Sequence, residues 1–154
     1  MKPIMPAAPR YFTPSAPEST VLNYALAWER RDSTMIASVL TDDYAGTSVD
    51  MTDPSPATLT FTKSDEIRAV GGLALDSGVS RVDVNLGGPW IRINSPGDPP
   101  EWKIIQRTGV MLSITYANSN DLHSNNSTLE FKLKPIASGS DTTWKIIRWS
   151  EVHT

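Results

Sequence analysis

The chain closes with Trp144-Lys145-Ile146-Ile147-Arg148-Trp149-Ser150-Glu151-Val152-His153. This stretch is rich in aromatic and β-branched residues and has no Gly or Pro, which predicts a β-strand. Side chains alternate across a strand, so Trp144 and Ile146 would lie on one face, and Ile147 and Trp149 on the other. Apolar side chains on both faces need cover on both sides. We therefore predict that this last strand lies in the middle of a sheet.

The residues that precede this stretch also predict strands. Apolar and polar residues alternate over 79–86, which is typical of a strand with one buried face. Residues 90–93, 102–116 and 129–134 have a similar strand-forming composition and are separated by loops rich in Gly, Pro or Asn. Gly109 interrupts the longest of these segments and is a predicted β-bulge.

The first part of the chain predicts helices instead. Four residues of segment 18–31 recur at the spacing of one helical face: Val21, Tyr24, Ala25 and Trp28. A second, shorter helix is predicted over 35–40, followed by a short strand over 44–51. A third helix opens at 62–66, where Thr62 can cap the amide of residue 65 and the early acidic residues suit the positive end of the helix dipole.

Helices that are segregated from a run of strands indicate an α+β domain. We predict an antiparallel sheet of about five to six strands with three helices across one face. The other face would then carry exposed apolar side chains, among them Trp144 or Trp149. Exposed apolar area of that kind usually marks an interface, which predicts a homodimer formed through the sheet.

Composition excludes several classes of protein and site. A length of 154 residues suits one domain, and a net charge of −3 disfavours nucleic acid as a partner. No apolar run is long enough for a transmembrane helix. The chain has no cysteine, which excludes disulfides and thiolate metal sites. No spacing typical of a metal or cofactor site is present, and neither His123 nor His153 adjoins a nucleophile motif.

Residues 1–17 carry Pro3, Pro6, Pro9, Pro14 and Pro17. Such spacing predicts an extended tether ahead of a single domain over 18–154. A tether of this kind often follows an export signal or a lipid anchor, which would place the domain in the cell envelope or periplasm. A terminus without a role is the alternative.

The order of elements, the closing strand and the phrase Leu40-Thr41-Asp42-Asp43-Tyr44 together resemble the nuclear transport factor 2-like superfamily, which includes SnoaL-like and ketosteroid-isomerase-like proteins. The resemblance covers roughly residues 18–153. It implies a strongly bent sheet that forms a cone, with the helices across its concave side. Within the superfamily the chain is most similar to uncharacterised bacterial lipoprotein-type members. The fold hosts enzymes and non-enzymes alike, so it does not by itself give an activity.

The resemblance to ketosteroid isomerase suggests catalytic residues to test. In that enzyme a tyrosine of the first helix contacts the substrate oxyanion, a carboxylate after the second helix shuttles a proton, and a protonated Asp assists the tyrosine. Tyr24 falls where the tyrosine would be, and Asp50 falls one residue after the position of the carboxylate. A one-residue slip in a strand reverses its face, and the assisting Asp has no counterpart in the strand around Phe131. Only one of the three roles, that of Tyr24, is therefore matched, and the activity is not carried over.

Our leading hypothesis from the sequence is a non-enzymatic, exported domain whose cone-shaped pocket accepts a small hydrophobic ligand, without a cofactor. Six residues are predicted to line that pocket: Tyr24, Trp28, Tyr44, Trp90, Met111 and Trp149. One alternative is a small isomerase or dehydratase that uses Asp50 and Tyr24. The other is a homodimeric interaction module with a filled cone and no ligand.

Overall fold

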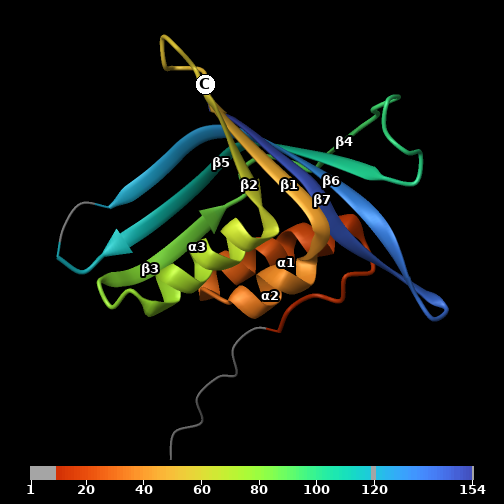
Figure 1. The fold of residues 1–154 in the computed structure, drawn as a ribbon, viewed down its shortest axis with the longest axis horizontal. Coiled ribbons are helices and arrows are strands. Elements are labelled where there is room, and N and C mark those ends of the chain that lie inside the picture. Colours follow the sequence, from red (N-terminus) through yellow and green to blue (C-terminus); the bar gives the residue numbers. More distant parts are fainter. Residues whose placement is uncertain (1–9, 119–120, 154) are drawn as a thin grey trace, which may run out of the picture.

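The computed structural model describes residues 10–118 and 121–153. Its elements follow one another in this order: α1 (Pro17–Arg30), α2 (Ser33–Val39), β1 (Leu40–Asp50), β2 (Thr58–Thr62), α3 (Lys63–Leu75), β3 (Val79–Asn85), β4 (Ile91–Ile93), β5 (Lys103–Tyr116), β6 (Leu122–Ser138) and β7 (Asp141–His153). The sheet arches over the helices, which all lie on its concave side (Figure 1). The predicted α+β cone is confirmed.

The sheet runs in the order β2-β1-β7-β6-β5-β3, and β4 pairs with the beginning of β5. β7 lies between β1 and β6, so its predicted position inside the sheet is confirmed. It pairs antiparallel with β6 but parallel with β1. The sheet is therefore mixed and not wholly antiparallel as predicted, because β1 and β7 run in the same direction.

A β-bulge in β7 changes which face each of its residues occupies. Leu133 pairs with Ile146 and Lys132 pairs with Arg148, which leaves Ile147 as an extra residue. The extra residue returns Trp149 to the concave face, where Trp144 also packs against the core. The prediction that these two tryptophans lie on opposite faces is therefore wrong.

The extra residue of the bulge, Ile147, is also buried. It is only 3% exposed, although it does not belong to the core cluster under the helices. Asp98, from the loop between β4 and β5, pairs with Lys132 at 2.7 Å beside this position. Ile146 and Ile147 are thus both buried, but only Ile146 belongs to the core cluster under the helices.

α2 and α3 each begin at a residue whose side chain caps the first turn of the helix. The Asp32 carboxylate accepts from the Met35 amide at the start of α2. At α3 the Thr62 hydroxyl accepts from the Asp65 amide, while the Asp65 carboxylate accepts from the Thr62 amide. This reciprocal cap fixes the first turn of α3 and hence the position of Glu66.

The residues just before α1 are held against the domain. The Tyr11 hydroxyl donates to Asp32 at 2.9 Å, and the Phe12 backbone exchanges two hydrogen bonds with the Asn23 side chain, both at 2.7 Å. The Trp144 amide donates to the Pro14 carbonyl at 3.0 Å. The first nine residues of the predicted tether lie outside the described part of the chain. Among the described residues, no helix is long and apolar enough to cross a membrane.

Candidate functional site

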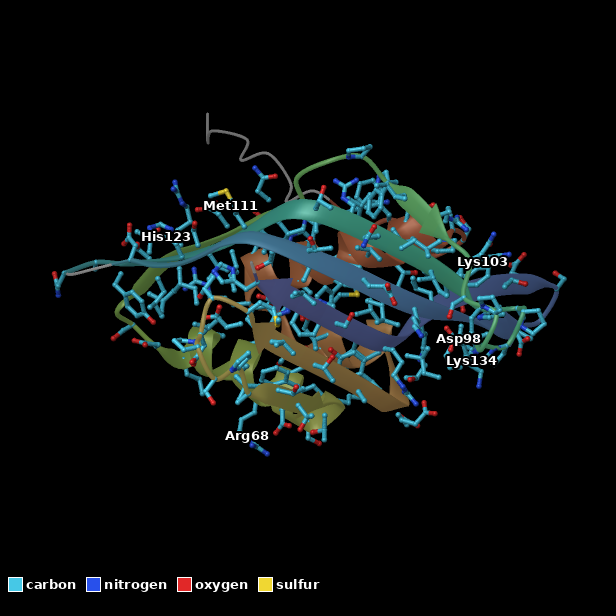
Figure 2. The ribbon with its side chains drawn as sticks, turned by 90° about the horizontal axis from the view of Figure 1, so that it is seen from above. Arg68, Asp98, Lys103, Met111, His123 and Lys134 are labelled. Carbon is cyan, nitrogen blue, oxygen red and sulfur yellow. The ribbon has the colours of Figure 1, made fainter. Side chains whose placement is uncertain are left out.

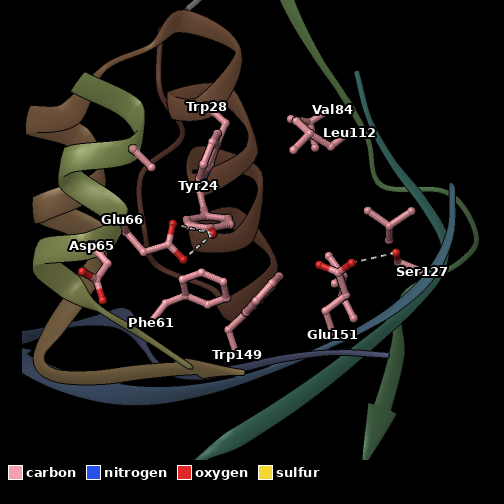
Figure 3. Close-up of a pocket in the computed structure, with 13 residues that line it drawn as sticks. Tyr24, Trp28, Phe61, Asp65, Glu66, Val84, Leu112, Ser127, Trp149 and Glu151 are labelled. Atoms are coloured by element: carbon pink, nitrogen blue, oxygen red, sulfur yellow. Dashed lines mark hydrogen bonds between the residues drawn. The ribbon is translucent and has the colours of Figure 1, made fainter. Parts of the chain in front are cut away.

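A pocket of about 300 Å³ opens between α1, α3 and the concave side of the sheet (Figure 3). Its wall is mainly aromatic and aliphatic: Tyr24, Trp28, Phe61, Ala69, Val84, Val110, Leu112, Leu129 and Trp149. Its polar residues are Asp65, Glu66, Ser127 and Glu151. The size and composition are those of a small-molecule site.

Three of the six residues predicted to line a pocket lie in this wall, namely Tyr24, Trp28 and Trp149. Tyr44 is buried behind the wall, where its hydroxyl reaches Glu66. Trp90 belongs to a separate groove beside α1, with the Arg107 guanidinium stacked 4.0 Å from its ring centroid.

Met111 is on the outer face of the sheet and 40% exposed (Figure 2). Its strand neighbours Val110 and Leu112 either line the pocket or lie in the core, so strand alternation turns Met111 the other way. Its predicted place in the pocket is therefore corrected.

Asp50 and Tyr24 are not brought together. Asp50 is exposed at the end of β1, and its carboxylate accepts from the Thr52 amide at 2.9 Å. Hydrogen bonds from Thr52 lower the pKa of Asp50. This is a turn in which the Asp side chain binds the backbone two residues on. The expected pairing of the two residues in one cavity is corrected.

The carboxylate that does meet Tyr24 is Glu66. Glu66 lines the pocket and is only 6% exposed. Tyr44 donates to its Oε1 at 2.8 Å, while the Tyr24 hydroxyl lies 3.2 Å from both carboxylate oxygens. Burial raises the pKa of Glu66, and the two tyrosine hydrogen bonds oppose that rise. The pKa values of both tyrosines are raised, chiefly by burial and then by the charge of Glu66.

Gly46 makes room for this arrangement. A Cβ at position 46 would lie 2.6 Å from the Tyr44 hydroxyl and 3.0 Å from a carbon of the Trp149 ring. Because the backbone of β1 passes so close, only glycine leaves both side chains where they are. The tyrosine that anchors Glu66 and the tryptophan that lines the pocket thus depend on the same small residue.

No protein-family model matches the chain, and no curated protein sequence matches it either. Solved structures do match. One is a nuclear transport factor 2-like superfamily protein from Salmonella enterica, with a TM-score of 0.60, 10% identity and coverage of 86% of this chain and 84% of that one. The chain has the nuclear transport factor 2-like fold.

Two further matches carry names that mention enzymes, and both come from Novosphingobium aromaticivorans. A putative scytalone dehydratase has a TM-score of 0.59 and 11% identity, covering 90% of this chain and 82% of that chain. The beta subunit of a putative aromatic-ring-hydroxylating dioxygenase has a TM-score of 0.60 and 12% identity, covering 92% and 89%. At such identities the likeness extends to the fold alone.

Within this nuclear transport factor 2-like cone, the pocket has a definite electrostatic character. Asp65, Glu66 and Glu151 line it, and none of the described residues in its wall is a Lys, Arg or His. Glu151 accepts from the Ser127 hydroxyl at 3.0 Å, and Asp65 lies 3.5 Å from Arg68. The described residues contain no group of three or more His, Cys, Asp or Glu side chains arranged to hold a metal ion. The site can therefore bind hydrogen-bond donors and positive charge, and Glu66 can accept a proton.

Proposed function

We propose that the chain binds a small, mainly apolar molecule in the concave pocket, with Glu66 as the polar anchor. The observation that carries this proposal is a buried carboxylate set in an otherwise apolar and aromatic wall. Apolar wall area gives affinity, while a single buried polar group orients the ligand and selects among ligands. The tyrosine hydrogen bonds hold the carboxylate in place before any ligand arrives, which reduces the entropy lost on binding.

An uncharged fluorescent probe tests the proposal. We expect N-phenyl-1-naphthylamine, whose emission rises in apolar surroundings, to bind the wild-type protein saturably. Ala69→Phe adds a ring to the pocket wall and should weaken that binding at least about tenfold, since it occupies ligand volume. Ala74→Phe, an exposed site on the same helix and outside the pocket, is the matched control. Emission that rises without saturation, equally in all three proteins, would contradict the proposal.

A second candidate is acid–base catalysis, and the burial of Glu66 favours it. A carboxyl group whose pKa is raised by burial is better placed to exchange protons near neutral pH. Glu66 would then take the role expected of Asp50. Tyr24 is less suited to polarising a substrate oxygen, because its single proton already points to Glu66.

Proton exchange separates this candidate from simple binding. A catalytic Glu66 should accelerate deuterium incorporation from D₂O into 3-cyclohexen-1-one, at the carbon between the carbonyl and the double bond. Glu66→Gln should abolish that acceleration because an amide cannot take up the proton. Exchange at the buffer rate in the wild-type protein would rule the candidate out for this class of ketone.

The homodimer through the sheet also remains a proposal. It is supported by the helices covering only one face of the sheet (Figure 1). It no longer draws support from Trp144 and Trp149, which face the helices. Sedimentation at micromolar concentration should give the mass of two chains, and the mass of one chain would contradict it. A protein that forms the dimer but does not bind the probe would match the hypothesis of a homodimeric interaction module without a ligand. Export of the domain is a separate proposal, and the proline-rich N-terminal residues support it.

A further inference from the structure

We infer that the pocket selects an organic cation, an ammonium group carried on an apolar body. The inference rests on the proposed binding function and names the chemical class of its ligand. It is carried by two independent features of the described part of the wall: carboxylates that have no ion-pair partner, and aromatic rings that have no cation against their faces.

The negative charge is that of Glu66 and Glu151. The ion pairs found among the described residues involve other acids: Asp42, Asp65, Asp83, Asp98 and Glu18. Glu66 receives hydroxyl hydrogen bonds and some support from the positive end of α3, but no full positive charge. A buried carboxylate without a counter-charge is costly, so a cation that enters the pocket relieves that cost.

Glu66 also keeps room for another hydrogen bond. Its Oε1 accepts the short bond from Tyr44, whereas among the described residues Oε2 is reached only by the Tyr24 hydroxyl, which is shared between both oxygens at 3.2 Å. A carboxylate has about four acceptor positions. A ligand N–H, or the polarised C–H groups of a quaternary ammonium, can use those that remain.

The aromatic rings are placed where such a head group would sit. The rings of Tyr24, Phe61 and Trp149 lie between Glu66 on one side and Glu151 on the other (Figure 3). Phe61 and Trp149 meet edge to face, with 6.2 Å between centroids and an interplanar angle of 68°, so their faces point in different directions. Ring faces attract cations. The cation–π contacts within the described residues, Arg30 on Tyr11 and Arg107 on Trp90, both lie outside the pocket.

Other ligand charges fit this wall less well. An anion would face Glu66 and Glu151, and none of the described residues that line the pocket is basic and could receive it. A neutral molecule would gain the apolar contacts but leave Glu66 uncompensated. Selection among ligands of one shape should therefore follow their charge.

Displacement of bound N-phenyl-1-naphthylamine tests this with three ligands of similar shape. These are phenyltrimethylammonium, its uncharged carbon isostere tert-butylbenzene, and the anion benzenesulfonate. We expect the cation to bind at least about tenfold more tightly than the isostere, as a desolvated cation–π contact and a buried charge pair permit, and the anion to bind most weakly. The quaternary ammonium does not titrate, so its binding reports on the protein alone.

Variants assign the preference to the carboxylates. Glu66→Gln keeps the size of the side chain and an oxygen for the tyrosines, and should remove most of the preference for the cation while the isostere binds as before. Glu151→Gln should reduce the preference by a smaller factor, since Glu151 is less buried than Glu66. Glu101→Gln, an exposed loop residue, makes the same change in net charge and should leave all three affinities unchanged.

The outcomes separate this inference from the proposed function. If the probe and the isostere bind but the cation binds no more tightly, the inference is wrong and the binding function stands. The same holds if Glu66→Gln keeps the full preference for the cation. If neither probe nor any of the three ligands binds, both are wrong.

Discussion

Phe131→Ala is expected to lower the free energy of unfolding by about 3–5 kcal/mol, as removal of a fully buried aromatic ring generally does. Phe131 is 0% exposed and belongs to the core between the sheet and the helices. Its ring meets Tyr24 edge to face, with 6.0 Å between the centroids. The central strands of a curved sheet have little freedom to collapse into the space left behind, so most of the cavity should persist.

Guanidinium chloride denaturation followed by circular dichroism measures this change. Phe12→Ala is the control, because that ring is 50% exposed and its loss should cost no more than about 0.5 kcal/mol. Phe131→Ala should also loosen the contact between Tyr24 and Glu66, since the Phe131 ring supports the tyrosine ring. A loss below about 1 kcal/mol for Phe131→Ala would mean that the core repacks around the missing ring and that the contacts of Phe131 contribute little to stability.

Element order and strand position could be predicted because they follow from local patterns. The apolar spacing of segment 18–31, the cap at Thr62 and the run of strand-forming residues after Val79 each reflect short-range physics. Gly109 was also predictable as a bulge: it has a φ of 68°, and the pairing of β5 with β6 shifts register there.

The bulge at Ile147 could not be predicted in the same way. The residues around it are ordinary strand formers with no glycine, so nothing local marks it. It exists because β7 must match β6, and that register is a property of the assembled sheet. A single extra residue was enough to place Trp149 in the pocket rather than on the outer face.

The sequence does not identify the site for a related reason. Distance along the chain suggests Asp50, but the turn at the end of β1 directs that side chain to solvent. The local helix pattern indicates Glu66 only as an acid that suits the helix dipole. Its signal was available: Glu66 lies four residues before Val70, on the face of α3 that packs inward, and both are buried. A charged residue on the apolar stripe of a helix is the pattern that points to a polar anchor in a pocket.

Tyr44→Phe is expected to cost about 1.5–3 kcal/mol of unfolding free energy near pH 7.5, which is typical for a lost hydrogen bond to a charged group. Near pH 4 the cost should fall to about 0.5–1.5 kcal/mol, because a larger share of Glu66 is then protonated and the lost bond is one between neutral groups. The variant removes the 2.8 Å hydrogen bond to Glu66 and leaves the ring in place.

The direction of this pH dependence follows from the pKa of Glu66. Burial raises that pKa in the folded state, so folding favours the protonated carboxyl. Any stability that Glu66 contributes is therefore present below its unfolded pKa and is lost as the pH rises through its folded pKa. Removing the Tyr44 hydroxyl raises the folded pKa of Glu66 further, so the loss in the variant continues to a higher pH than in the wild type.

Denaturation curves at both pH values measure the effect, and two comparisons make it specific. Tyr116→Phe removes a hydroxyl from a half-buried tyrosine at the end of β5, away from Glu66, and should show no such pH dependence. In a Glu66→Gln background, Tyr44→Phe should cost about 0.5–1.5 kcal/mol at either pH, because no charge remains to be stabilised. An equal cost at both pH values in the wild-type background would show that Tyr44 does not stabilise a charged Glu66. The pocket would then present a neutral carboxyl group to its ligand.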